Sequence, residues 1–249
     1  MTVHFVGSGP GAADLLTLRA AALLRASPVC VYAGTYIDDE VLGHCPDGVC
    51  LVDTQHLDLD QIIEHLVAAD AEGHDVVRLC SGDPSVYSAL AEQTRRLDAA
   101  GVPWDVTPGV PAYAAAAAIL RAELTVPELV QTVVLTRTQA RSTQMPQSES
   151  LAQLARTRAS LVLHLAITRI RALVEDLVTE YGEDCPVAVV AHATRPNELV
   201  LRGTLTDIAD QVEAADLRHT AVIIVGRALA AGDVTGSYLY DPSRTRRPS

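Results

Sequence analysis

The chain has 249 residues, a net charge of −12 and a hydrophobic fraction of 49%. This length predicts one large or two small globular domains, and the composition excludes a disordered chain. The acidic balance argues against a nucleic-acid footprint or a polybasic membrane patch. All 19 basic residues are arginine. The absence of lysine excludes Schiff-base catalysis, the P-loop lysine and the kinase strand lysine.

The N-terminal segment and the cysteines predict a cytoplasmic protein with reduced thiols. No basic region followed by an apolar core begins at Met1, and no run of about 18 apolar residues occurs. None of the five cysteines forms Cys-x-x-Cys. Cys30, Cys50 and Cys80 lie in or at the ends of apolar runs, so we expect them to be small buried side chains.

The first half of the chain alternates short apolar runs with helical patterns. Strands are expected at 3–6, 29–32, 49–52, 75–80 and 103–106, and helices at 14–26, 59–71, 86–100 and 111–120. In the helix at 14–26, Leu15, Leu18, Ala22 and Leu23 are expected to form the buried face. This alternation predicts a mainly parallel sheet covered on both faces.

The second half has five expected strands and fewer helices. The strands are at 131–136, 160–165, 186–192, 198–201 and 220–225, and the helices at 149–156, 168–181 and 207–215. The link between the strands at 186–192 and 198–201 is too short for a crossover helix, so this pair should be antiparallel. We therefore expect two α/β domains, 1–115 with a mainly parallel sheet and 116–249 with a mixed sheet. The polar segment 137–149 is expected to be a mobile or substrate-capping loop.

A glycine-rich loop follows the first expected strand. Gly7-x-Gly9-x-x-Ala12 has the spacing of a dinucleotide fingerprint. The second strand, however, ends in Tyr32-Ala33-Gly34, where the fingerprint needs an acid, and Pro10 removes a backbone donor from the loop. An NAD-dependent oxidoreductase, a structural turn and a site for another ligand all remain open from this motif alone.

Two further glycine loops follow later strands. The loop at 81–87 contains Gly82 and Asp83, and the loop at 107–112 contains Gly109. Asp83 offers a carboxylate at the strand end, or it caps the next helix. Since ligands bind beyond the carboxyl ends of parallel strands, the three loops together outline a pocket. The scattered histidines include no His-x-x-x-His pair, so no metal site is expected.

These loops carry motifs of a known family. V-G-S-G-P-G at 6–11, R-L-C-S-G-D-P at 78–84 and P-G-V at 108–110 resemble the tetrapyrrole methylase family of class III methyltransferases. Similar segments at 185–189, 193–194, 203–205 and 221–226 extend the resemblance over nearly the whole chain. The segments at 31–34, 82–87, 123–128 and 131–137 resemble the branch of the family that acts on precorrin-4.

The resemblance implies a fold, a reaction and a set of site residues. It implies two α/β domains with S-adenosylmethionine in the cleft between them, no metal, and a homodimer. The implied reaction transfers a methyl group to C11 of precorrin-4, giving precorrin-5 and S-adenosylhomocysteine in corrin ring biosynthesis. The donor-binding residues carried over by the motifs are Pro10, Ser81, Gly82, Asp83, Val86, Pro111, Ala112, Leu165, Ala193 and Thr220.

The implied acceptor is a polycarboxylate, so an acidic protein needs local cations to hold it. Arg78, Arg121, Arg137 and Arg141 are the candidates, because arginine binds carboxylates bidentately; each could instead be a structural or surface charge. Asp83 is the candidate catalytic residue, expected to bind the donor or to tune the loss of a proton. Cobalt-precorrin-4 as acceptor, another methylation position and a non-catalytic tetrapyrrole carrier remain open alternatives.

Overall fold

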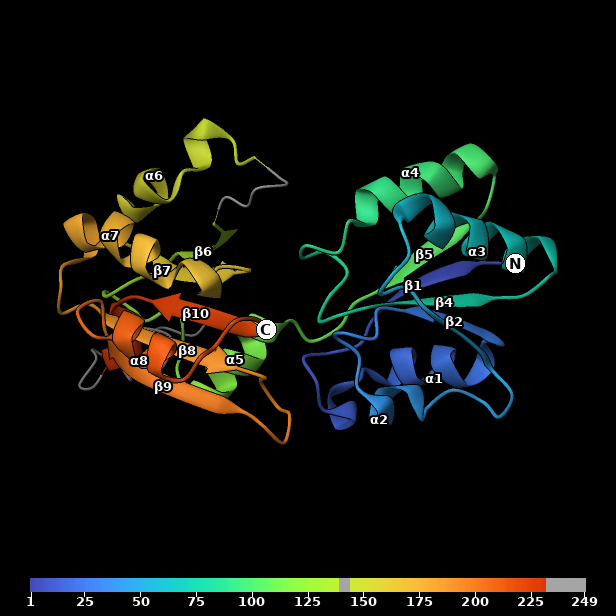
Figure 1. Cartoon of the computed structure of the whole chain (residues 1–249), viewed down its shortest axis with the longest axis horizontal. Coiled ribbons are helices and arrows are strands. Elements are labelled where there is room, and N and C mark those ends of the chain that lie inside the picture. Colours follow the sequence, from blue (N-terminus) through green and yellow to red (C-terminus); the bar gives the residue numbers. More distant parts are fainter. Residues whose placement is uncertain (139–143, 232–249) are drawn as a thin grey trace, which may run out of the picture. The chain divides into compact units, whose positions relative to one another are not determined.

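The computed structural model describes residues 1–138 and 144–231 of the chain (Figure 1). The chain divides into two compact units. Of the described residues, the first unit contains 1–115 together with 193–196, and the second contains those of 116–192 and 197–231. The return of 193–196 to the first unit has no signal in the sequence. Among the described helices, none has the length and apolar character needed to cross a membrane.

The first unit is built on a five-stranded sheet of order β3-β2-β4-β1-β5, in which every pairing is parallel. Leu24 and Val41 pack on one face of this sheet, and Leu66 and Leu97 pack on the other. Figure 1 shows α1 and α2 on the first face and α3 and α4 on the second. The parallel sheet predicted from the sequence is confirmed. Its elements are β1 (Val3–Gly7), α1 (Leu18–Ala26), β2 (Val29–Tyr32), α2 (Asp39–Leu42), β3 (Cys50–Asp53), α3 (Leu59–Ala71), β4 (Val76–Cys80), α4 (Leu90–Ala100) and β5 (Trp104–Thr107).

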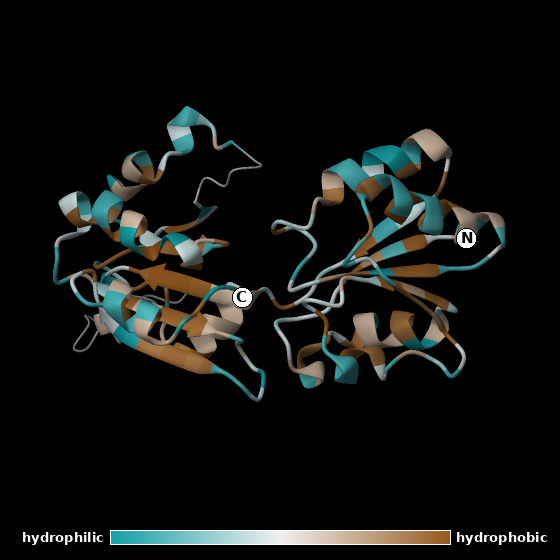
Figure 2. Ribbon diagram, viewed as in Figure 1, coloured by the Kyte–Doolittle hydropathy of each residue, from teal (hydrophilic) through white to brown (hydrophobic). Residues whose placement is uncertain are grey.

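The second unit holds a mixed sheet of order β6-β7-β10-β8-β9. Strands β6 and β7 are parallel, and the other pairings, including the expected β8–β9 pair, are antiparallel. Leu173 and Leu177 of α7 and Ile208 of α8 pack with Leu161 and Ile223 of the sheet. Figure 2 shows these strands as hydrophobic and the helices as partly hydrophilic. Its elements are α5 (Ala112–Leu120), which contains the boundary between the units, β6 (Val133–Arg137), α6 (Leu151–Ala155), β7 (Ser160–His164), α7 (Ile170–Tyr181), β8 (Pro186–Ala191), β9 (Leu199–Thr204), α8 (Ile208–Ala214) and β10 (Ala221–Val225).

The expected buried face of the first helix is wrong. Leu18 is 91% exposed, and the buried residues of α1 are Ala20, Ala21 and Leu24. The cause is Thr17, whose hydroxyl accepts a hydrogen bond from the Ala20 amide at 3.1 Å and starts the helix there. The residues before it form only a 3₁₀ turn, so the periodicity counted from residue 15 does not belong to this helix.

Two other expectations also need correction. The helix expected at 86–100 begins only at Leu90, because Tyr87 and Ala89 have φ values of 55° that no α-helix contains. Cys30 and Cys80 are buried as expected, but Cys50 is exposed, since it lies in β3 at the edge of the sheet.

Candidate functional site

The loops that follow β1, β4 and β5 meet at the carboxyl edge of the first unit's sheet. Gly9 and Gly82 exchange backbone hydrogen bonds of 3.2 and 2.9 Å. A Cβ added at Gly7 would lie 2.5 Å from the Gly109 nitrogen, and a Cβ at Gly109 would lie 2.2 Å from the Gly82 oxygen. Backbone packs directly on backbone here, so only glycine fits. The structure therefore brings together the three glycine loops singled out in the sequence.

Most of the donor-binding residues expected in the first unit lie in these loops. Gly82 has a φ of +67°, and a Cβ at this position would be 3.6 Å from the Ala112 nitrogen and from the Pro111 Cα. The loop after β4 thus touches the start of α5. Ser81 is exposed and Val86 is half-buried, so both side chains remain accessible on this edge.

Asp83 ties two of the glycine loops together. One carboxylate oxygen accepts the Gly109 amide at 2.8 Å, and the other accepts the Ser85 amide at 2.8 Å and the Ser85 hydroxyl. Burial alone would raise the pKa of Asp83, but these hydrogen bonds outweigh it and lower the pKa below its ordinary value of 3.8. The group is therefore an anion near neutral pH. Asp83 does not cap α4, which begins seven residues later at Leu90.

The tip of the β8–β9 hairpin reaches the first glycine loop within the first unit. The amide of Ala12, two residues after Pro10, donates to the Thr194 hydroxyl at 3.0 Å. A Cβ at Gly11 would lie 2.9 Å from the Ala193 oxygen. Two expected donor-binding positions, Pro10 and Ala193, are thereby placed on segments in contact. Thr194 itself was missed, because nothing local in the sequence indicates a partner so far along the chain.

The second unit places Leu165 and Thr220 at one edge of its mixed sheet. Leu165 follows β7 and Thr220 precedes β10, and the antiparallel pairing of Leu163 with Ile223 puts both at the same edge. The His192 amide donates to the Thr220 oxygen at 2.8 Å, so β8 ends there too. Leu165, His192 and Thr220 have φ values of 52°, 49° and 54°. Left-handed backbone at a residue other than glycine is costly and gathers at ligand sites.

The candidate arginines lie in different environments. Arg78 is only 8% exposed, and its guanidinium donates to the Gln93 side chain at 3.0 Å and to the Val31 oxygen at 3.4 Å. These contacts favour the structural alternative for Arg78. Arg121 follows α5 and is exposed. Arg141 lies outside the described residues.

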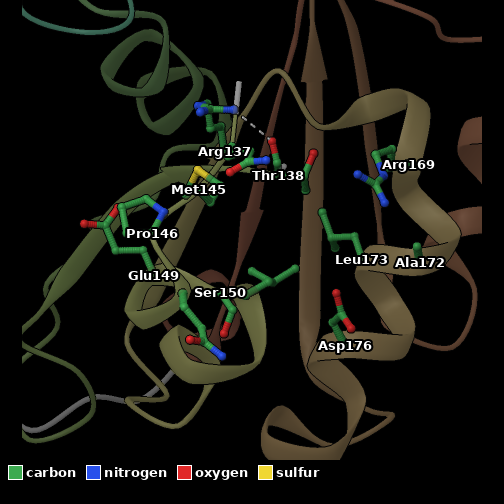
Figure 3. A pocket seen from close by; sticks show the side chains of 13 residues that line it. Arg137, Thr138, Met145, Pro146, Glu149, Ser150, Arg169, Ala172, Leu173 and Asp176 are labelled. Atoms are coloured by element: carbon green, nitrogen blue, oxygen red, sulfur yellow. Dashed lines mark hydrogen bonds between the residues drawn. The ribbon is translucent and has the colours of Figure 1, made fainter. Parts of the chain in front are cut away.

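Arg137 lines a cavity of about 530 Å³ within the second unit (Figure 3). It ends β6, and Arg169 enters the same cavity from the turn before α7. Figure 3 shows the two guanidinium groups on opposite sides, with Thr138 between them. Glu149 and Asp176 also line the cavity, so its charges are mixed. Arg169 is not a candidate in the sequence, because it falls at the start of the helix expected at 168–181 and carries no motif.

Within residues 1–138 and 144–231, no group of three or more His, Cys, Asp or Glu side chains is arranged to hold a metal ion. His164 ends β7 at the edge that carries Leu165, and burial lowers the pKa of its imidazole. The titratable groups described at the first unit's edge include the Asp83 carboxylate, and those at the second unit's edge include the His164 imidazole.

Comparison with known proteins gives the family. Residues 2–209 match the family model of the Tetrapyrrole (Corrin/Porphyrin) Methylases. The chain belongs to the tetrapyrrole methylase family. A precorrin-4 C(11)-methyltransferase from Rhodococcus erythropolis is 56% identical over 246 residues, which cover 99% of each chain.

Solved structures of tetrapyrrole methylases share the fold. A cobalt precorrin-4 methyltransferase described as a cobalamin biosynthetic enzyme matches with a TM-score of 0.89 and 34% identity, over 92% of this chain and 95% of that one. A uroporphyrin-III C-methyl transferase from Thermus thermophilus, complexed with S-adenyl homocysteine, matches with a TM-score of 0.77 and 27% identity, over 93% of this chain and all of that one. The motifs that suggested the family thus belong to a fold shared over 92–93% of the chain.

Proposed function

We propose that the protein transfers a methyl group from S-adenosylmethionine to C11 of precorrin-4, giving precorrin-5 and S-adenosylhomocysteine on the route to cobalamin. The observation that carries the proposal is the match of nearly the entire chain, at 56% identity, to a methyltransferase of that name. The packed glycine loops support it, because they are the segments in which the resemblance places donor contacts. Membership in the tetrapyrrole methylase family argues against the alternative of an NAD-dependent oxidoreductase.

The rate of this reaction depends more on the positioning of the methyl group than on a strong base. The methyl group moves from a sulfonium cation to a ring carbon of the macrocycle; the S–C bond breaks as the C–C bond forms, and S-adenosylhomocysteine leaves as a neutral thioether. Positive charge is dispersed in this step, so holding the methyl group in line with the carbon supplies most of the rate. The proton that the macrocycle later loses goes to solvent or to a nearby base.

We assign donor binding to the expected residues of both units. Pro10, Ser81, Gly82, Val86, Pro111, Ala112 and Ala193 lie in the loops of the first unit, and Leu165 and Thr220 lie at the sheet edge of the second. Asp83 serves as an anionic residue beside the donor. Its carboxylate is already committed to Gly109 and Ser85. It therefore acts by fixing the loops and by its charge rather than by taking a proton.

We assign acceptor binding to the cationic groups of the second unit, with Arg137 first among them. Arg137 ends a strand at the carboxyl edge of the parallel β6–β7 pair, where ligands of such sheets bind. Its guanidinium lines a cavity of about 530 Å³, which is large enough for a carboxylate side chain and its water. Arg121 is exposed and remains a second candidate.

Three further properties complete the proposal. The protein is expected to act in the cytoplasm, to work without a metal and to form a homodimer. Light scattering of the purified protein measures the oligomeric state directly. A monomer at micromolar concentration would contradict the proposed homodimer and would leave the proposed reaction unaffected.

The reaction is tested with two acceptors prepared enzymatically, precorrin-4 and cobalt-precorrin-4. Each is incubated with S-adenosylmethionine and the protein, and the products are examined by mass spectrometry. Gain of one methyl group on precorrin-4 supports the proposal. Gain of a methyl group on cobalt-precorrin-4 alone would contradict precorrin-4 as the acceptor and would indicate the substrate of the cobalt precorrin-4 methyltransferase that is 34% identical. No gain on either, with donor binding intact or absent, would contradict the proposed reaction.

A further inference from the structure

We infer that Thr194 and Arg195 are positioning residues for the methyl donor, because they fasten two loops of the first unit's sheet edge to the tip of the β8–β9 hairpin. One loop is the glycine loop after β1, and the other follows β2. The inference rests on the proposed function, since it concerns the donor site. Neither residue was expected to have a role from the sequence.

Thr194 holds the first glycine loop by its side chain. Its hydroxyl accepts the Ala12 amide at 3.0 Å, across 182 positions of the chain. The same hydroxyl oxygen lies 3.1 Å from the position of a Cβ on Gly11. Gly11 is therefore required to be glycine by the hairpin tip, and the loop conformation around Pro10 depends on a residue far away in the sequence.

Arg195 extends the attachment to a second loop. Its Nη2 donates to the backbone carbonyl oxygen of Tyr36 at 2.5 Å, and its Cγ lies 2.7 Å from the position that a Cβ on Gly11 would take. Tyr36 belongs to the loop between β2 and α2. That loop is in turn held by Asp53, which accepts the Gly34 amide at 2.9 Å. The hairpin tip thus joins the loops of two parallel strands at the edge where ligands bind.

The backbone at the tip is strained in a way that this attachment explains. Thr194 has a φ of +66°, and a β-branched residue in the left-handed region is a true outlier. Such strain persists only where surrounding contacts over-determine the conformation, and it gathers at functional sites. With this left-handed backbone the Thr194 hydroxyl faces the Ala12 amide. The residue directly before it, Ala193, is one of the expected donor-binding residues. One residue therefore sets the position of both Ala193 and the Pro10 loop.

The consequence is specific to donor binding. If the hydroxyl is lost, the Ala12 amide loses its acceptor and the glycine loop can shift relative to Ala193. The loops around Gly82 and Gly109 keep their own contacts, since these do not involve the hairpin tip. We therefore expect donor affinity to fall while the fold of the first unit remains intact.

The test compares Thr194→Val with Thr194→Ser. Valine keeps the β-branch and the volume and removes only the hydroxyl, whereas serine keeps the hydroxyl. Binding of S-adenosylhomocysteine is measured by titration calorimetry. Thr194→Val is expected to bind about tenfold more weakly than wild type, which is the effect of losing one well-placed hydrogen bond. Thr194→Ser is expected to stay within about twofold of wild type.

Two controls separate positioning from general damage. In the second unit the Thr157 hydroxyl likewise accepts a backbone amide, that of Ala159 at 3.3 Å, and it donates to the Leu154 carbonyl oxygen at 2.7 Å, so Thr157→Val is a matched substitution away from the proposed site. It is expected to bind S-adenosylhomocysteine as wild type does. The amide resonance of Ala12, followed by NMR, is expected to shift in Thr194→Val and to stay in place in Thr194→Ser.

The outcomes distinguish the two proposals. Wild-type protein that does not bind S-adenosylhomocysteine would overturn the proposed function, and this inference with it. Wild-type binding together with unchanged binding by Thr194→Val would overturn the inference alone. Equal loss in Thr194→Val and Thr194→Ser would also overturn it, because the hydroxyl would then not be the group that matters.

Discussion

Replacing Asp83 with asparagine removes the charge from the residue that joins two glycine loops. The carboxylate has two accepting oxygens, one for the Gly109 amide and one for the Ser85 amide and hydroxyl. Asparagine keeps one accepting oxygen and turns the other into a donor. Either Gly109 or Ser85 must therefore lose its acceptor. Asp83→Asn is expected to weaken the link between the loops after β4 and β5 without altering side-chain volume.

The size of the effect follows from these contacts. A hydrogen bond from an amide to a charged group contributes about 1.5–3 kcal/mol, and solvent reduces this at a partly exposed residue. We expect Asp83→Asn to lower the free energy of unfolding by about 1–2 kcal/mol, and the Tm by about 2–8 °C for a chain of this size. We also expect donor affinity to fall about tenfold, because the loops carry most of the expected donor contacts.

The assay pairs urea unfolding with calorimetric titration of S-adenosylhomocysteine and with turnover. Asp207→Asn is the matched control. Asp207 also accepts a backbone amide, that of Thr204 at 2.6 Å, but it lies in the second unit before α8. It is expected to lose stability and keep donor affinity. If Asp83→Asn kept both donor affinity and turnover at wild-type values, the role given to Asp83 would be refuted.

Three further predictions follow from the same geometry. Arg137→Gln is expected to raise the KM for the macrocycle and leave donor binding unchanged; equal KM values in variant and wild type would contradict its assignment. Gly7→Ala is expected to destabilise the first unit by about 3 kcal/mol or more in urea, since its Cβ would lie 2.5 Å from the Gly109 nitrogen; wild-type stability would show that the loops do not pack this closely. Hydrogen bonds from Gly34 and Gln55 lower the pKa of Asp53, and that of Asp83 is lowered as well. The stability that these two carboxylates contribute is therefore present above about pH 4 and lost as the pH falls through the lowered values; urea midpoints that do not fall on acidification would contradict this.

Much of the fold could be predicted because its signals are local. Alternating apolar runs and helical patterns give a parallel sheet, and a short link gives the antiparallel β8–β9 pair. The amphipathic pattern of Ile62, Ile63 and Leu66 predicts the helix at Leu59–Ala71 with its correct ends, and the structure adds a capping box of Asp58 and Gln61 at its start. The resemblance that named the family rested on continuous motifs, and the family match confirms it.

The errors occur where tertiary contacts or turn geometry override a local pattern. Periodicity placed Leu18 in the core, but the Thr17 cap starts a new helical register. The helix before Leu90 was expected from composition, while left-handed residues at Tyr87 and Ala89 delay it. Both alternatives stay open for Arg78 from the sequence alone; its burial against Gln93 favours the structural one, and this contact depends on tertiary packing that no local rule predicts.

In the candidate site too, the features with local motifs could be predicted and those that depend on tertiary contacts could not. The three glycine loops could be singled out from the sequence, because each follows a strand and carries a motif. Their direct packing, through Gly7, Gly82 and Gly109, could not, since it depends on strand order in the sheet. The contact between Thr194 and Ala12 could not be predicted either, because the two residues are 182 positions apart and meet only when the β8–β9 hairpin has formed.

The central claim is methyl transfer to C11 of precorrin-4, and one measurement tests it most directly. S-adenosylmethionine labelled with carbon-13 at the methyl group is supplied with enzymatically generated precorrin-4, and the product is read by NMR. A single new labelled methyl group on C11 is the expected result. Label at another ring position, or no label on a substrate that a known enzyme converts, would contradict it.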